Sequence, residues 1–325
     1  MSLKSIPRIV LMATSLLTSG ATLAQGVTIG GTPANGEATG FSAMFAGDRF
    51  ENFRNMDRFV PTSEMTPSAE PWHLGSNADS LEYTGEFLNE TTTLQDFIAL
   101  SDTSALLVLK DGKVIHETYA HGDSRESLHI SFSMAKSFTS ALLGIALGEG
   151  KIDSLDDPIR KYLPALTSAT FDGVSIKHVL QMSSGTRFTE VYTDPESDIN
   201  KMTTMVPPMT YLEYINTLGR EHAPGTFNHY ASINTQLLGI LLLSVTETTL
   251  TDYMQSRLWH PLGMEQRGLW VLDEQGQEHN SAEELPVGPD GYPIGGETEG
   301  DDAKRQEERC QQGHDANLPP VDVPA

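Results

Sequence analysis

The chain has 325 residues, an apolar fraction of 38% and a formal net charge of −23 at pH 7. This length can hold one large domain or two small ones. The acidity argues against nucleic acid as a partner, because phosphate binding needs clustered lysine and arginine side chains and the sequence has no basic stripe. The single cysteine, Cys310, excludes an internal disulfide and a cysteine-rich metal site.

Residues 1–24 predict a secretory signal peptide. Lys4 and Arg8 form a positive region, 9–17 is mostly apolar, and small residues lead to a cleavage site after Ala24. The alternative is a membrane anchor, but the apolar stretch is short for a span and is interrupted by serine and threonine. We therefore expect a periplasmic or secreted protein with no stable membrane span after signal cleavage.

The pattern then changes from loops to regular elements. Residues 25–95 are rich in glycine, serine, threonine, asparagine and proline and predict a loop-rich lead-in. The apolar runs 105–109 and 114–119, joined by Asp111-Gly112, predict a β-hairpin. Apolar residues at helical spacing predict a buried helix over 133–147. Further helices are predicted over 175–182, 211–218, 234–245 and 251–258.

The C-terminal segment 273–325 differs in composition from the rest of the chain. It contains fourteen acidic residues against Lys304, Arg305 and Arg309, with many glycines and prolines. Such a composition is typical of disorder. We therefore predict an acidic disordered tail.

Ser133-Met134-Ala135-Lys136 carries the first catalytic hypothesis. Side chains at i and i+3 share one helix face, and a helix N-terminus offers free backbone N–H groups. A serine hydroxyl needs a base to become a nucleophile. Lowering a lysine pKa from about 10.4 to about 7, so that it can be that base, needs roughly 4–5 kcal/mol of desolvation or like charge. The alternative is a helix-capping serine with a solvated lysine, since one such spacing is expected by chance in a chain of this length.

Tyr230 provides a second element, because it stands just before the predicted helix over 234–245. A phenol at that position can point into a cleft and relay a proton between a lysine, a serine and a leaving group. The alternative is an ordinary buried tyrosine whose hydroxyl is hydrogen-bonded.

Several motifs occur in a fixed order between residues 95 and 272. After the hairpin they are 131–138, 150–158, 162–164, 176–185, 224–227, Tyr230-Ala231-Ser232, 236–239 and Pro261-Leu262-Gly263-Met264. In this order they resemble the serine β-lactamase and penicillin-binding superfamily. The resemblance is to its class C-like branch, which includes esterases, D-aminopeptidases and 6-aminohexanoate-dimer hydrolases. The order is far more specific than any single motif.

The resemblance implies an α+β fold over 96–272, in which helices and an all-helical subregion flank an antiparallel sheet. It also implies a serine hydrolase that acts on a small-molecule amide or ester. Ser133 would be the acylated nucleophile, Lys136 its base and Tyr230 the proton relay. Ser232 would be a polar, substrate-binding residue near the lysine. The backbone N–H of Ser133 would form half of an oxyanion hole.

The chain departs from the family after Leu272. The family continues with further sheet strands, one of which carries a Lys-Thr-Gly or His-x-Gly box and the second oxyanion donor. No such box is found here, so we predict an incomplete domain with C-terminal strands missing. The alternative function is accordingly a truncated, catalytically inactive protein of the same architecture. A secreted binding module that uses 25–95 is a third hypothesis.

Other chemistries and the substrate are less constrained. The ten histidines contain no His-x-x-x-His spacing and no His-Glu pair that suggests a metal site, so we predict no metal and no cofactor. The absence of a Gly-x-Ser-x-Gly elbow argues against an α/β-hydrolase triad. A β-lactam, a D-amino peptide, a linear amide and a short ester all remain open as substrates. The form of the motifs favours an esterase or amide hydrolase over a true β-lactamase.

Overall fold

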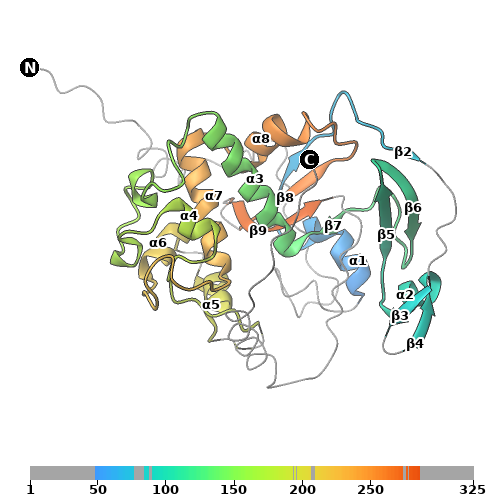
Figure 1. Ribbon diagram of the computed structural model, residues 1–325, viewed down its shortest axis with the longest axis horizontal. Helices are drawn as coiled ribbons and strands as arrows, with labels where there is room; N and C mark the ends of the chain where they lie inside the picture. The colour runs from blue at the N-terminus through green and yellow to red at the C-terminus, as the bar shows by residue number, and fades with distance from the viewer. Residues whose placement is uncertain are drawn as a thin grey trace, which may run out of the picture. The chain divides into compact units, whose positions relative to one another are not determined.

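The computed structural model describes residues 48–76, 84–87, 90–192, 194, 196–205, 209–273, 276 and 278–285. The chain forms two compact units (Figure 1). The larger comprises Met1–Tyr83 and Ser104–Pro289, and the smaller comprises Thr84–Thr103 and Asp290–Ala325. The predicted signal peptide lies outside the described residues.

The helices of the larger unit begin at side-chain caps where the sequence offers them. The Ser175 hydroxyl accepts the His178 N–H at 3.2 Å, and the His178 ring accepts the Ser175 N–H in return. Thr210 and Thr249 cap two other helices in the same way. The helices are α1 (Arg49–Arg54), α3 (Ala135–Gly148), α4 (Ile176–Leu180), α5 (Asp198–Met205), α6 (Tyr211–Thr217), α7 (Ser232–Thr246) and α8 (Leu250–Met254).

Short helical turns complete this part of the fold. A π-helical turn, Gln255–Trp259, directly follows α8. The 3₁₀ turns are Met56–Arg58, Phe132–Met134, Ile159–Lys161 and Ala169–Phe171.

Two sheets accompany the helices in the larger unit. One has the strand order β1-β8-β9-β7, and all its pairs are antiparallel. The other has the order β2-β6-β5; β5 and β6 form the predicted hairpin, and β2 pairs with β6 in parallel. The bounds are β1 (Thr62–Met65), β2 (Gly75–Ser76), β5 (Ala105–Lys110), β6 (Lys113–Tyr119), β7 (His129–Ile130), β8 (Gly268–Leu272) and β9 (Glu278–Leu285).

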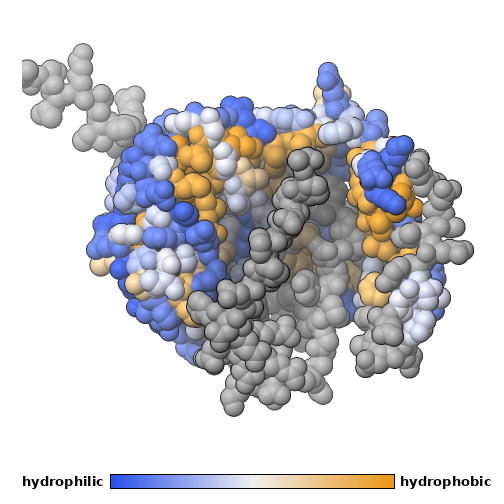
Figure 2. Space-filling view, in the orientation of Figure 1, coloured by the Kyte–Doolittle hydropathy of each residue, from blue (hydrophilic) through white to orange (hydrophobic). Residues whose placement is uncertain are grey.

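The hairpin turn has the geometry that its sequence requires. Asp111 and Gly112 both have positive φ, 53° and 71°, which matches the right-handed twist of the flanking strands. Leu107 and Leu109 of β5 are 37% and 47% exposed and contribute to the apolar patch over the hairpin in Figure 2. The prediction of this hairpin is confirmed.

In the smaller unit the structure describes one strand pair and one helix, all within Thr84–Thr103. β3 (Thr84–Phe87) and β4 (Glu90–Thr93) pair in antiparallel fashion. Thr93 then caps α2 (Leu94–Leu100), because its hydroxyl accepts the Asp96 N–H at 3.2 Å.

The packing of α3 against α7 positions the candidate site. Leu142 and Leu143 of α3 have no exposed surface, and the same holds for Leu241 and Leu242 of α7. Burying each such side chain contributes about 1.5–3 kcal/mol. The two helices therefore hold their N-terminal ends in a fixed relation, and it is at these ends that the candidate residues lie.

Most predicted elements agree with the structure, and the α+β class with helices beside antiparallel strands is confirmed. The prediction of a disordered tail from 273 is wrong for Glu278–Leu285, which form β9. This segment lacks an apolar alternation, but its backbone pairs with β8 on one side and β7 on the other. Strand formation depends strongly on such tertiary pairing. The lead-in 25–95, predicted to be loop-rich, contains α1 and β1 among its described residues. In the part of the chain that the structure describes, no helix is long and apolar enough to span a bilayer.

Candidate active site

Ser133 lies on a sharp turn between β7 and α3. The 3₁₀ turn Phe132–Met134 makes this connection, and Phe132 has a φ of 45°. A non-glycine residue in the left-handed region is strained and needs support from its surroundings. The Phe53 ring on α1 supplies it by packing edge-on against the Phe132 ring, with centroids 5.6 Å apart.

A buried charge cluster anchors the strand that leads to this turn. The Asp123 carboxylate is fully buried; Oδ1 lies 2.6 Å from Arg54 Nη1 and Oδ2 lies 3.1 Å from His129 Nε2. Burial lowers the pKa of His129 from its ordinary value, and this effect outweighs the opposing charge of Asp123. Since His129 begins β7, the cluster fixes the chain four residues before Ser133.

Ser133 and Lys136 are in direct contact. Lys136 Nζ donates to Ser133 Oγ at 3.0 Å, as expected for i and i+3 positions at the start of a helix. Ser133 is exposed and Lys136 is partly buried, so the serine is accessible. With the amine neutral, the same contact would let the serine hydroxyl donate its proton to nitrogen.

The structure brings Tyr230 to the same place. Lys136 Nζ lies 5.3 Å from the centroid of the Tyr230 ring. Tyr230 is 46% exposed and precedes α7 by two residues, so its phenol faces the accessible side of the site. The three residues predicted to be catalytic are therefore neighbours, although nearly a hundred positions separate Tyr230 from Ser133.

Ser232 is placed differently from the other three. It is 3% exposed and begins α7, and its backbone N–H donates to the Glu190 carboxylate. This is a helix-terminal anion contact, in which a carboxylate satisfies a free N–H group at the positive end of the helix. Substrate binding by the Ser232 hydroxyl remains a prediction.

Two residues near Tyr230 were not predicted from the sequence. Glu190 holds the start of α7, and the Tyr192 hydroxyl lies 3.5 Å from Glu190 Oε2. Tyr192 is 66% exposed overall, yet desolvation of its hydroxyl and the nearby Glu190 and Tyr230 raise its pKa to about 12. These residues add a carboxylate and a neutral phenol to the edge of the site. No sequence motif indicates Glu190 and Tyr192, because their loop lies near Tyr230 only in the folded chain.

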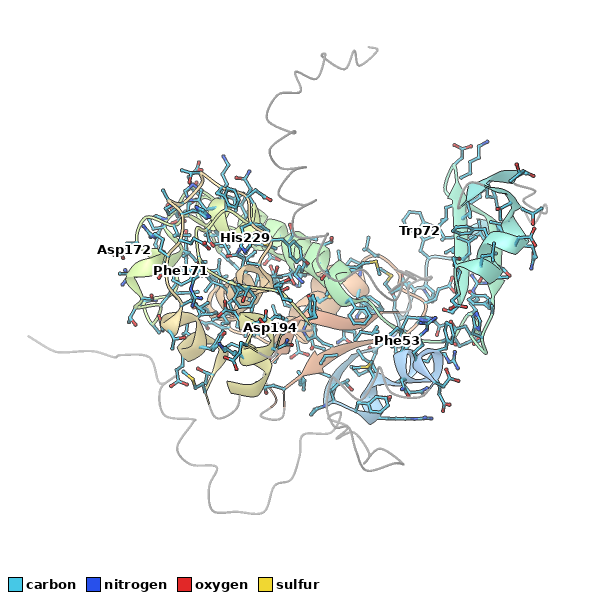
Figure 3. The ribbon with its side chains drawn as sticks, turned by 90° about the horizontal axis from the view of Figure 1, so that it is seen from below. Phe53, Trp72, Phe171, Asp172, Asp194 and His229 are labelled. Carbon is cyan, nitrogen blue, oxygen red and sulfur yellow. The ribbon has the colours of Figure 1, made fainter. Side chains whose placement is uncertain are left out.

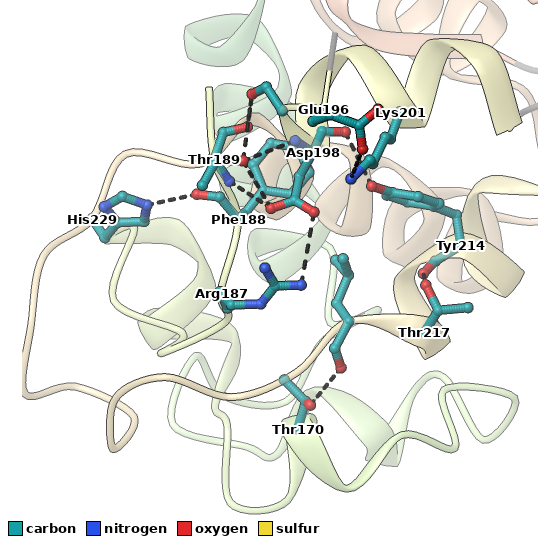
Figure 4. A network of polar contacts seen from close by, with 12 residues as sticks. Thr170, Arg187, Phe188, Thr189, Glu196, Asp198, Lys201, Tyr214, Thr217 and His229 are labelled. Atoms are coloured by element: carbon teal, nitrogen blue, oxygen red, sulfur yellow. Dashed lines mark hydrogen bonds and ion pairs between the residues drawn. The ribbon is translucent and has the colours of Figure 1, made fainter. Parts of the chain in front are cut away.

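The histidine beside the candidate relay has a structural contact. His229, which is labelled in Figure 3, has its Nε2 2.8 Å from the Phe188 carbonyl oxygen, a contact drawn in Figure 4. This nitrogen therefore carries the proton and donates. Among the described residues, no group of histidine, cysteine, aspartate and glutamate side chains could hold a metal ion.

An open hollow of about 260 Å³ lies beside Lys136. It is lined by Lys136, Ser137, Ser140, Leu180, Met182, Thr235 and Leu238. Three hydroxyl groups and an amine can hydrogen-bond water or a polar leaving group there, and Leu180, Met182 and Leu238 give the lining an apolar part.

This fold and this serine–lysine–tyrosine arrangement define the class of β-lactamase-like and penicillin-binding-type proteins. The family model Beta-lactamase matches residues 99–307, so the match continues beyond Leu272, where we expected the resemblance to end. The chain therefore belongs to the beta-lactamase family.

The relatives support this assignment. The chain is 27% identical over 239 residues to a 6-aminohexanoate-dimer hydrolase of Paenarthrobacter ureafaciens, covering 69% of this chain and 58% of that protein. It is 26% identical over 185 residues to a beta-lactamase of Escherichia coli (strain K12), covering 55% and 46%. A solved structure, a putative 6-aminohexanoate-dimer hydrolase from Bacillus anthracis, has the same fold with a TM-score of 0.70 and 19% identity, covering 78% of this chain and 70% of that one. The chain spans about half the length of the curated relatives it matches.

Proposed function

We propose that the chain is a serine hydrolase that cleaves an amide or ester through an acyl-enzyme on Ser133. The contact of 3.0 Å between Lys136 Nζ and Ser133 Oγ carries this proposal. An amine at hydrogen-bond distance is the base that a serine nucleophile needs. The exposure of Ser133 leaves its oxygen open to a carbonyl carbon.

The proposed reaction has two halves. Ser133 Oγ bonds to the substrate carbonyl carbon while its proton passes to Lys136 Nζ, and the Ser133 N–H stabilises the oxyanion. The carbonyl reforms as the bond to the leaving amine or alcohol breaks, and Tyr230 relays a proton to that group. A water molecule then attacks the acyl-enzyme, loses a proton to the same groups and releases the acid and free Ser133.

We further propose a linear amide or short ester as the substrate class. Of the two curated relatives described above, the one that matches the larger share of this chain is named as a 6-aminohexanoate-dimer hydrolase. The open hollow beside Lys136 and the accessible Tyr230 leave room for an extended substrate. Export to the periplasm or outside the cell is part of the proposal; it rests on the pattern of residues 1–24 and is tested by fractionating cells that express the chain with a C-terminal tag.

A fluorophosphonate probe tests the nucleophile directly. Wild-type protein should be labelled and should hydrolyse p-nitrophenyl esters. Ser133→Ala should lose both properties, whereas Ser256→Ala is a control, because it removes an exposed hydroxyl from the turn after α8 and Ser256 does not line the hollow beside Lys136. Lys136→Ala should lower turnover by about 10²–10⁴-fold.

Two results would oppose the proposal. Equal labelling of wild type and Ser133→Ala would show that another residue is the nucleophile. A folded wild type that is neither labelled nor active would favour the inactive protein of the same architecture.

A further inference from the structure

The segment Phe188 to Glu190 contacts the chain on both sides of Tyr230. On one side, His229 Nε2 donates to the Phe188 carbonyl oxygen at 2.8 Å. On the other, the Ser232 N–H donates to the Glu190 carboxylate. Tyr230 is therefore held between two hydrogen bonds to the same short segment.

The backbone determines where the phenol lies. In the part of the chain that the structure describes, the Tyr230 hydroxyl has no hydrogen bond, and the residue is 46% exposed. Its polar neighbours include Lys136, whose Nζ lies near the ring, and Tyr192, whose pKa it helps to raise. A side chain without a polar anchor of its own follows its backbone, so the two hydrogen bonds that flank Tyr230 set its position.

Asp198 in turn fixes the segment. Asp198 Oδ2 accepts the Thr189 N–H at 2.9 Å and the Thr189 hydroxyl at 3.0 Å, and the Asp198 N–H donates back to Thr189 Oγ1 at 2.9 Å (Figure 4). The residue is only 6% exposed, and Arg187 Nη2 lies 3.9 Å from its other carboxylate oxygen. Hydrogen bonds to a buried carboxylate are strong and directional.

Neighbouring hydrogen bonds further restrain the contact between Asp198 and Thr189. Ser197 Oγ donates to the Thr189 carbonyl at 2.7 Å and accepts the Val191 N–H at 2.9 Å. The Tyr214 hydroxyl of α6 donates to the Asp198 carbonyl at 3.0 Å. A continuous path of hydrogen bonds thus runs from α6 through the start of α5 to the segment that flanks Tyr230.

We infer that Asp198 is a positioning residue that holds the Tyr230 phenol in place through Thr189. Among the described residues, Asp198 makes no hydrogen bond or ion pair with Ser133 or Lys136, so we assign its effect to the relay. This inference rests on the proposed function of Tyr230. Displacing a reacting group by about 1 Å can lower a rate about 10²-fold, which makes the effect measurable.

The test separates the relay from the nucleophile. Asp198→Ala and the nearly isosteric Thr189→Val should each lower kcat on an ester at least about tenfold. Fluorophosphonate labelling needs only Ser133 and its base, so its rate should stay within about threefold of wild type. Thr249→Val, which removes a capping hydroxyl from α8, is the matched control and should leave kcat unchanged.

A double-mutant cycle gives the deciding outcome. If Asp198 acts through Tyr230, Asp198→Ala has little further effect on kcat in the Tyr230→Phe background. The same loss of kcat in both backgrounds would overturn the inference while leaving the Ser133 assignment intact. Failure of the proposed function looks different, because labelling or turnover would then not depend on Ser133.

The position of the phenol can also be followed without turnover. In protein labelled with 3-fluorotyrosine, the ¹⁹F resonance of Tyr230, assigned with Tyr230→Phe, should shift or broaden in Asp198→Ala. The resonance of Tyr253, whose hydroxyl donates a hydrogen bond to Glu149, should stay unchanged. An unchanged Tyr230 resonance would overturn the inference even if the protein has no activity.

Discussion

A substitution at Gly185 tests the close packing of this residue against the backbone at His222. It has a φ of +79°, and a Cβ built on it would lie 2.1 Å from the His222 carbonyl oxygen. Real Cβ atoms do not approach backbone oxygens so closely, so the chain must move. The Gly185 carbonyl also accepts the N–H groups of Glu221 and His222, at 2.8 and 3.1 Å.

The cost of Gly185→Ala follows from these contacts. A left-handed conformation costs a residue with a Cβ roughly 1–2 kcal/mol. A backbone shift that relieves the clash weakens two hydrogen bonds, each of which contributes about 0.5–1.5 kcal/mol. We therefore expect the free energy of unfolding to fall by about 2–5 kcal/mol.

Gly173→Ala is the matched control, because Gly173 has a φ of +73° and its Cβ would meet no atom within 4 Å. This substitution should cost only about 1–2 kcal/mol. Urea unfolding followed by far-UV circular dichroism gives both values. If the two substitutions cost the same within about 0.5 kcal/mol, the close approach of Gly185 to His222 is not a real constraint.

Three further predictions concern stability. Gly144→Ala in α3 should stabilise the protein by about 0.5–1 kcal/mol in urea unfolding, because its Cβ would meet nothing within 4 Å. His129 has a lowered pKa in the folded state, so the unfolded chain takes up the proton first as the pH falls below 6.5. Stability should therefore decrease between pH 7.5 and 5.5, and less so in His129→Gln. Leu142→Ala should cost about 2–5 kcal/mol, whereas Leu109→Ala on the exposed hairpin face should cost far less.

Local signals explain which parts of the fold could be predicted. The hairpin was found because Asp111-Gly112 requires positive φ at both positions, and the structure has it. The helices α3 and α7 were found because long apolar runs at helical spacing have few other solutions. Ser133 and Lys136 follow from α3 directly, since their contact depends only on positions within one helix turn.

The remaining features depend on contacts between distant segments. Strand β9 forms by pairing with β8 on one side and β7 on the other, and no residue pattern within Glu278–Leu285 predicts this pairing. The Glu190 carboxylate accepts a hydrogen bond from Ser232, forty-two positions away. Asp198, at the start of α5, accepts one from Thr189, which lies in a loop without a sequence motif. Hydrogen bonds of this kind form only in the tertiary fold, so they produce no periodic pattern in the sequence.

Phe132 shows how far the serine–lysine motif depends on residues outside it. Its left-handed backbone is unfavourable by roughly 1–2 kcal/mol and must be stabilised by packing. That packing comes from Phe53 and from a small apolar cluster in which Met56 of the lead-in is fully buried beside Ile130. The lead-in, for which a separate binding role was one hypothesis, is therefore part of the scaffold that aims Ser133. A serine–lysine motif grafted without these N-terminal residues would keep its spacing and lose the turn that presents the serine.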